Sequence, residues 1–154
     1  LMLSPLPVIG DDLEIEPLFR EPLHLVAPPD HRLSAVPVLT RKHLSGAALL
    51  SLDPRHHFHR QTRTICEDLG ATLLRDYEGT SLDSLRQMVG SGLGLAVLPK
   101  LYLRSEAGGE KMISRLEVAD WSTSRSIAAV WRRGSASRNL YDIIARKVAQ
   151  EARR

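Results

Sequence analysis

The pattern of apolar and polar positions is clearest between Thr80 and Pro99. Apolar residues recur there at helical spacing, at Leu82, Leu85, Met88 and Val89. Thr80 is placed to cap this helix, with Asp83 as the return partner of a capping box. Two glycines, Gly90 and Gly92, can end the helix, and the apolar run 93–98 then predicts a buried strand. A strand that is apolar on both faces is typical of a parallel sheet covered by helices.

The rest of the chain alternates between strand-like and helix-like patterns. Strands are predicted over residues 1–3, 14–19, 23–27, 47–52, 71–77, 113–118 and 126–131. Pro17 suits an edge or a bend rather than a central strand. Helices are predicted within 37–46 (capped by Thr40), over 57–69, near 101–106 and from about 137 to 152, and an exposed loop is predicted over 107–111.

Two of these helices have a defined apolar face. In helix 57–69 the face consists of Phe58, Thr62, Ile65, Cys66 and Leu69, and Gly70 is a natural stop. In the last helix it consists of Leu140, Ile143, Ile144 and Val148. The alternation of strands and helices predicts an α/β fold with a doubly wound sheet.

Ligands of such sheets lie at the carboxyl ends of the strands, where loops lead into helices. Two junctions of this kind are visible, at residues 52–59 and 77–81. A helix N-terminus at Thr80–Ser81 offers backbone N–H groups and hydroxyls to a polar ligand such as a carboxylate. The same two residues can also serve as a helix cap and nothing more.

Composition limits the class of protein. The 154 residues carry a net charge of +3, with 43% hydrophobic and 25% charged residues, as in a soluble globular protein. The positive charge is mild and dispersed along the chain, so it does not favour nucleic-acid binding by this segment. Cys66 is the only cysteine, so an intrachain disulfide cannot form, and a reducing cytoplasmic location is expected. No apolar run reaches the roughly 20 residues that span a bilayer.

No catalytic constellation emerges from the motifs, so we expect a protein that is not an enzyme. The glycines of 90–94 fail as a dinucleotide fingerprint because the run follows a helix and precedes a strand. The histidines His56, His57 and His59 could hold a metal, but no carboxylate or cysteine stands at a supporting spacing. We therefore expect neither a cofactor nor a metal. The simplest interpretation of the three histidines is that they are solvated loop residues.

Three sets of motifs follow one another along nearly the whole chain. They are Pro17–Leu23 with Val26–Pro28 and Asp30–Leu33, then Thr80–Leu85 with Met88–Gly94 and Leu98–Pro99, then Trp131–Ser135 before the last helix. Together they resemble the effector-binding domain of LysR-type transcriptional regulators. Within that family, His56–Gln61, Cys66 and Leu69–Ala71 are similar to the redox segment of the OxyR branch, whose members are hydrogen-peroxide sensors.

The resemblance implies two α/β subdomains of the periplasmic-binding-protein type II kind. Residues 1–19 and 125–154 would form part of regulatory subdomain I, and residues 20–124 would form subdomain II. The family's DNA-binding winged helix-turn-helix would be absent from this chain, which starts as if in the middle of a domain. The resemblance also implies homodimers or tetramers and a small polar effector in the cleft between subdomains. A solute-binding transport protein of the same bilobal fold is the alternative.

The resemblance further implies which residues matter. Ser4, His56, His57, Thr80 and Ser81 would contact the effector. His57 stands where the OxyR branch has its peroxide-reactive cysteine, and Cys66 where it has the resolving one. With a single thiol, a thiol-to-disulfide switch cannot operate within this chain. Cys66 is expected on the buried face of its helix, roughly 13 Å along the axis from His57.

Overall fold

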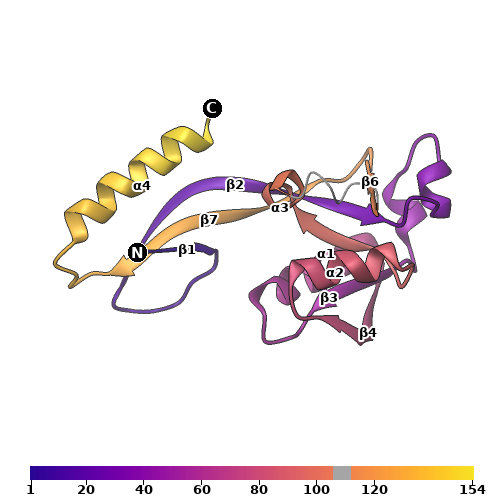
Figure 1. The fold of residues 1–154 in the computed structure, drawn as a ribbon, viewed down its shortest axis with the longest axis horizontal. Coiled ribbons are helices and arrows are strands. Elements are labelled where there is room, and N and C mark those ends of the chain that lie inside the picture. Colours follow the sequence, from indigo (N-terminus) through magenta and orange to yellow (C-terminus); the bar gives the residue numbers. More distant parts are fainter. Residues whose placement is uncertain (106–111) are drawn as a thin grey trace. The chain divides into compact units, whose positions relative to one another are not determined.

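A computed structural model describes residues 1–105 and 112–154 (Figure 1). The predicted loop over 107–111 lies outside the described residues. The strands are β1 (Met2–Pro5), β2 (Leu13–Ala27), β3 (Ala48–Leu52), β4 (Thr72–Gly79), β5 (Ala96–Pro99), β6 (Ser114–Leu116) and β7 (Thr123–Arg132). The α-helices are α1 (His57–Leu69), α2 (Leu82–Gly90), α3 (Lys100–Ser105) and α4 (Arg138–Ala152), and short 3₁₀ helices span Arg32–Ala35 and Arg41–Leu44.

The chain forms two compact units. Unit 1 comprises Leu1–Pro22 and Ser124–Arg154, and unit 2 comprises Leu23–Thr123. Unit 2 contains the larger core, which includes Leu25, Leu49, Leu50, Leu52, Phe58, Leu85 and Leu98, each at most 2% exposed. Burying each such side chain stabilises the fold by about 1.5–3 kcal/mol.

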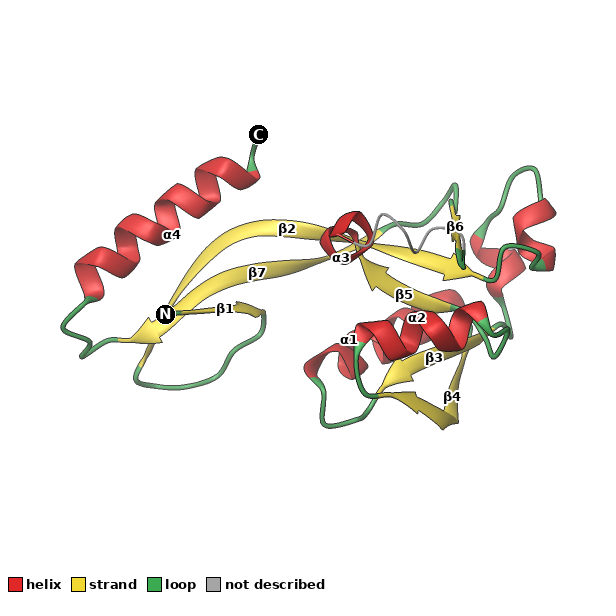
Figure 2. Ribbon diagram, viewed as in Figure 1, coloured by secondary structure: helices red, strands yellow, loops and turns green. Residues whose placement is uncertain are grey.

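The sheet of unit 2 is mixed in direction, so the prediction of a parallel sheet was only partly right. Strands β3 and β4 are parallel and form a two-stranded sheet (Figure 2). An isolated parallel bridge links Leu49 of β3 to Leu95, the residue before β5. In contrast, β5 and β6 each pair with β2 in the antiparallel direction. The sequence of β5 could not show this, because burial on both faces makes a strand apolar whatever its direction.

Helix α1 has the predicted bounds and the predicted buried face. Phe58, Thr62, Ile65, Cys66 and Leu69 are all buried. Gly70 follows in the left-handed conformation, with φ of 64°, and ends the helix. The short helix at Arg41–Leu44 begins after Thr40 as predicted, and its Leu44 is fully buried.

Strand β2 corrects a second prediction. Instead of a bent segment over 14–19 and a separate strand over 23–27, one strand runs from Leu13 to Ala27 through Pro17 and Pro22. It lies between β7 and β5 in the strand order rather than at an edge. A proline removes only its own N–H from the ladder, and its fixed φ is close to extended backbone, so flanking residues can maintain the pairing.

In unit 1, β1 pairs antiparallel with β7, and α4 packs on a small core of Leu18, Ala129, Trp131 and Ala145. The predicted face of α4 was wrong except for Val148. Leu140, Ile143 and Ile144 are 55%, 64% and 37% exposed, and the packed side instead carries Tyr141, Ala145, Val148 and Ala149. Apolar residues lie along two sides of α4. The packed side includes two small alanines, so it is the less hydrophobic of the two and harder to recognise in the sequence.

A buried ion pair also stabilises unit 1. Both Nε and Nη2 of Arg125 lie 2.8 Å from Oε2 of Glu21. The Glu21 side chain is only 3% exposed and that of Arg125 16%. A buried carboxylate needs such a partner, because transfer of an unpaired charge out of water is costly.

Candidate functional site

The two predicted strand-to-helix junctions lie side by side at one edge of unit 2. In the parallel pair β3 and β4, Leu52 is in register with Gly79. Just beyond, the backbone N–H of Asp53 donates to the carbonyl of Gly79 at 3.0 Å. The loops that lead into α1 and α2 therefore leave the sheet from adjacent positions.

At the start of α1, His56 is the N-cap residue. Its Nδ1 accepts the backbone N–H of Phe58 at 3.2 Å, and its own N–H donates to the carbonyl of Asp53 at 2.8 Å. His56 is exposed, whereas His57, the first residue of the helix, is half-buried. The imidazole of His56 thus performs the capping task that a serine or aspartate usually has.

A third histidine, His59, is anchored in the sheet, which the sequence did not suggest. Its Nδ1 lies 2.9 Å from the carbonyl oxygen of Leu52 and 3.1 Å from Oγ of the buried Ser51. Because a carbonyl only accepts, Nδ1 of His59 carries a proton and donates. The available signal was Ser51, a polar residue within the apolar run 47–52.

The turn between β3 and α1 holds a second feature that the sequence analysis missed. Nη2 and Nε of Arg55 donate to the two carboxylate oxygens of Asp53 at 2.8 and 2.9 Å. These hydrogen bonds, with that from the backbone N–H of Arg55, hold the pKa of Asp53 well below its usual range. The sequence indicates this contact by an aspartate two residues before an arginine, directly after a predicted buried strand.

The cap of α2 differs from the predicted one. The N-cap is Ser81, not Thr80, and its capping-box partner is Ser84, not Asp83. Oγ of Ser84 accepts the backbone N–H groups of Thr80 and Ser81 at 2.9 and 3.0 Å, and Ser84 N–H donates to Ser81 Oγ at 3.1 Å. The backbone N–H groups of Thr80 and Ser81 are therefore engaged within the chain. Their hydroxyl groups are the polar atoms that this segment offers.

Asp83 has a different role. Its Oδ1 accepts the hydroxyl of Tyr102 on α3 at 2.5 Å and lies 3.8 Å from Nη2 of Arg86. Burial, followed by this hydrogen bond, raises the pKa of Tyr102 to about 12. Asp83 therefore ties α2 to α3 rather than closing its own helix.

The other two candidate residues lie elsewhere. Ser4 is partly buried in β1 of unit 1, where its Oγ donates to the carbonyl of Pro5 at 3.2 Å. Cys66 is 4% exposed on the core face of α1. Burial, with a smaller contribution from Glu67, raises the pKa of the Cys66 thiol to about 11. At neutral pH this thiol is protonated and shielded, which disfavours it as a nucleophile.

The described residues contain no group of three His, Cys, Asp or Glu side chains arranged to hold a metal ion. Within the same part of the chain, the helices are all too short or too polar to cross a membrane.

Comparison with known protein families shows to which family the chain belongs. The model of the LysR substrate-binding domain matches residues 1–149. The chain belongs to this family. A LysR substrate-binding domain agrees with the α/β fold and with polar junctions at the carboxyl ends of β3 and β4.

Two curated relatives are named as transcriptional regulators or gene activators. The chain is 31% identical over 137 residues to the hydrogen peroxide-inducible genes activator of Haemophilus influenzae, covering 89% of this chain and 45% of the relative. It is 31% identical over 132 residues to the DNA-binding transcriptional dual regulator OxyR of Escherichia coli K12, covering 86% and 43%. The chain thus spans less than half the length of these curated relatives.

Solved structures give the same result. The reduced OxyR regulatory domain of Pseudomonas aeruginosa superposes with a TM-score of 0.78 at 28% identity, covering 96% of this chain and 69% of that one. The fold is therefore that of OxyR-like LysR regulatory domains. Because the curated relatives are named as transcriptional regulators, the transport-protein alternative is not favoured.

Proposed function

We propose that this LysR substrate-binding domain binds a small polar effector and serves as the sensing and oligomerising part of a transcriptional regulator. The two units would be its regulatory subdomains. The observation that carries the proposal is the hydrogen bond between Asp53 and Gly79, which brings the starts of α1 and α2 to one sheet edge. DNA contact is proposed for a part of the protein outside these residues, and dimers or tetramers are the proposed assembly.

The proposed effector contacts in unit 2 are His56, His57, Thr80 and Ser81. The exposed imidazole of His56 and the hydroxyls of Thr80 and Ser81 can donate hydrogen bonds to an oxyanion, so a carboxylate is the proposed effector class. Since Ser84 already occupies the backbone N–H groups of Thr80 and Ser81, side chains would provide the recognition.

A panel of small mono- and dicarboxylates tests this proposal through the thermal unfolding of the purified chain. We expect at least one to raise the Tm of the wild type, and Thr80→Val to abolish most of that rise. Thr72→Val is the matched control, since Thr72 is also exposed but begins β4 at the opposite end of the strand. A panel without any effect on the wild type, or an equal loss in both variants, would contradict the carboxylate assignment.

The proposal assigns no thiol switch to this chain. The relative from Haemophilus influenzae is named for hydrogen peroxide, but here Cys66 is the single cysteine and lies in the core. Mass spectrometry after brief treatment with peroxide should find Cys66 unmodified in the folded chain. Rapid formation of a sulfenic acid at Cys66 would instead assign a peroxide response to this domain.

A further inference from the structure

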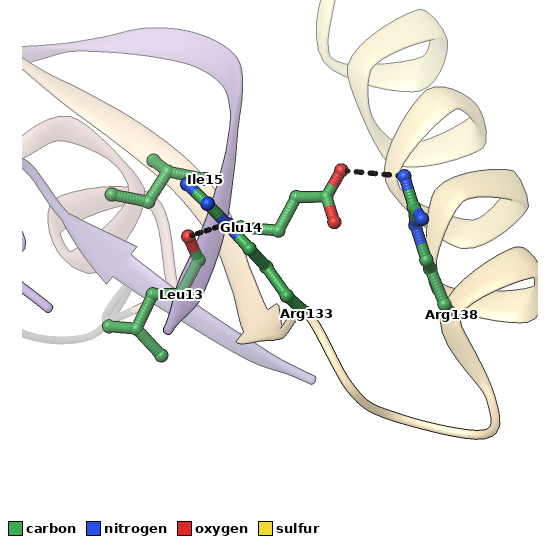
Figure 3. Close-up of a pocket in the computed structure, with 5 residues that line it drawn as sticks. All are labelled: Leu13, Glu14, Ile15, Arg133 and Arg138. Carbon is green, nitrogen blue, oxygen red and sulfur yellow. Dashed lines mark hydrogen bonds and ion pairs between the residues drawn. The ribbon is translucent and has the colours of Figure 1, made fainter. Parts of the chain in front are cut away.

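All six histidines of the chain, at positions 24, 31, 43, 56, 57 and 59, lie in unit 2. Imidazole is the side chain that ordinarily changes its charge between about pH 5 and 8. Unit 1 contains no histidine, and its ion pairs join arginine to carboxylate, as Nη2 of Arg138 joins Oε1 of Glu14 at 3.3 Å (Figure 3). A structural response to mild acid is therefore expected in unit 2.

Three of these histidines accept a backbone N–H at the start of a helix through the same ring atom, Nδ1. The pairs are Leu33 to His31 at 3.2 Å, Thr40 to His43 at 3.0 Å and Phe58 to His56 at 3.2 Å. The first two lie at the 3₁₀ helices Arg32–Ala35 and Arg41–Leu44, and the third lies at α1. A ring nitrogen that accepts an N–H carries no proton, so each of these rings is neutral and has its proton on Nε2.

Protonation of the three rings is incompatible with these bonds. A proton on Nδ1 would face the N–H that this atom accepts, so each backbone N–H would lose its acceptor. A positive charge is also unfavourable at the start of α1, because the helix dipole is positive there. His59 differs from the three, since its Nδ1 donates to the carbonyl of Leu52 and a protonated ring keeps that bond. Mild acid therefore opposes the three caps but not the anchor of His59.

We propose that His31, His43 and His56 act together as an acid-sensitive switch in unit 2. Near neutral pH their rings hold the starts of three helices. Below about pH 6 the rings become charged, the caps are lost and the fold of unit 2 is destabilised. His56 also lies at the proposed effector edge, but the switch requires no effector. This proposal and the carboxylate proposal can therefore fail separately.

The surroundings of His31 agree with this direction. Burial, followed by the charge of Arg32, lowers the pKa of His31, whereas Asp30 raises it. Strand β6 packs against this helix and carries Arg115, which is paired with Glu117 at 2.8 Å. Because the pKa of His31 is lower in the folded chain, the unfolded chain binds more protons below about pH 6.5. The folded state therefore loses stability as the pH falls through this range.

The second 3₁₀ helix, which contains His43, already carries the cations Arg41 and Lys42. Two carboxylates from other elements contact it, and Arg41 engages both. Its Nη2 lies 3.4 Å from Oδ1 of Asp68 on α1, and its backbone N–H donates to Oδ1 of Asp120 at 2.8 Å. Protonation of His43 would add a third positive charge to this short helix.

The titratable and charged groups around His56 are Asp53 and Arg55 in the preceding loop, Glu78 on β4, and His57, His59 and Arg60 on α1. Asp53 is paired with Arg55, and Glu78 is attracted to the same guanidinium. A charged His56 would therefore enter a cluster in which both carboxylates already interact with an arginine.

Thermal unfolding of the full chain at about pH 7.5 and about pH 5.5 tests the proposal. We expect the Tm of the wild type to fall by about 5 °C or more between these conditions. The triple variant His31→Asn, His43→Gln and His56→Asn keeps an uncharged acceptor at each cap. Its Tm should fall by less than about half as much. His24, whose pKa is lowered mainly by burial, is present in both proteins and so does not affect the comparison.

His59→Gln is the matched control, because it removes a titratable ring from α1 without removing a cap. The Tm of this variant should fall with pH as much as that of the wild type. An equal fall in the wild type and the triple variant would overturn the proposal. A fall in His59→Gln as small as that in the triple variant would overturn it as well.

The ring tautomers provide a test that requires no variant to fold. Nitrogen-15 NMR of the wild-type histidine rings at about pH 7.5 should find the proton of His31, His43 and His56 on Nε2. His59 provides the internal contrast, because its Nδ1 should carry a proton. A proton on Nδ1 of any of the three capping rings at this pH would overturn the proposal.

Discussion

The backbone N–H of Asp53 lies 3.0 Å from the carbonyl oxygen of Gly79 and donates to it. This one bond continues the parallel pairing of β3 and β4 beyond Leu52 and holds the two exit loops together. It makes His56 and Ser81, 25 positions apart in the sequence, parts of one polar edge. The proposed effector site depends on that adjacency and on the caps of the two helices.

The first prediction concerns the cap of α2. Ser84→Ala removes the hydroxyl that accepts two backbone N–H groups, so the free energy of unfolding should fall by about 1 kcal/mol. Equilibrium unfolding in urea measures this loss of unfolding free energy. Ser91→Ala, which removes one hydroxyl bond to the carbonyl of Gln87 after α2, should change it by less than about 0.5 kcal/mol. Equal effects would show that Ser84 is not the stabilising cap.

Gly94 tests the close packing between β5 and β3. A Cβ at this position would lie 3.0 Å from the carbonyl oxygen of Ala48 and 3.1 Å from Cδ1 of Leu74. Gly94→Ala should therefore lower the free energy of unfolding by about 2 kcal/mol. Gly134→Ala is the control, because a Cβ there meets nothing within 4 Å, and its effect should stay within about 0.5 kcal/mol. A tolerated Gly94→Ala would contradict the packing.

The ion pair of unit 1 allows a double-mutant cycle. Arg125→Met leaves the carboxylate of Glu21 buried without its guanidinium, and should cost about 3 kcal/mol of unfolding free energy. Adding Glu21→Leu to that variant should restore much of the loss, because no charge then remains buried. Chemical unfolding of the two single variants and the double variant gives the coupling energy. A coupling energy near zero would mean that the pair does not act as a unit.

Cys66 predicts a pH dependence. Its pKa is raised to about 11 in the folded chain, against about 8.5 for a free thiol, so the folded state binds more protons between these values. The unfolding free energy of the wild type should therefore fall as pH rises from about 8.5 to 11. Cys66→Ser lacks this contribution. The difference in unfolding free energy between the wild type and this variant should therefore shrink or reverse as the pH rises. A difference that stays constant would show that the thiol pKa is not raised.

The sequence was most informative where local chemistry alone decides the structure. Helix α1 has its predicted bounds because an apolar face and a glycine stop are both local signals. The cap of α2 was misplaced by one residue, since Thr80, Ser81, Asp83 and Ser84 can all cap, and only side-chain rotamers select among them. Strand direction and the packed face of α4 depend on partners far apart in the sequence, which periodicity cannot reveal.

The candidate site was predictable in its position but not in its chemistry. The two junctions follow from the order of strands and helices. The contacts of Arg55 with Asp53 and of His59 with Ser51 require the geometry of a turn and a helix start. The prediction of free backbone N–H groups at Thr80 was wrong because Ser84 reaches back one turn, a reciprocal bond that a pattern of hydrophobicity does not encode.

The exposed arc of α4 has a practical consequence for work with this chain. Leu140, Ile143 and Ile144 present a contiguous apolar stripe to water. Sulfate or phosphate at high concentration strengthens the association of such surfaces, so these salts should promote precipitation of the chain. Replacing Ile143, the most exposed of the three, with lysine should therefore raise the solubility limit without disturbing the core.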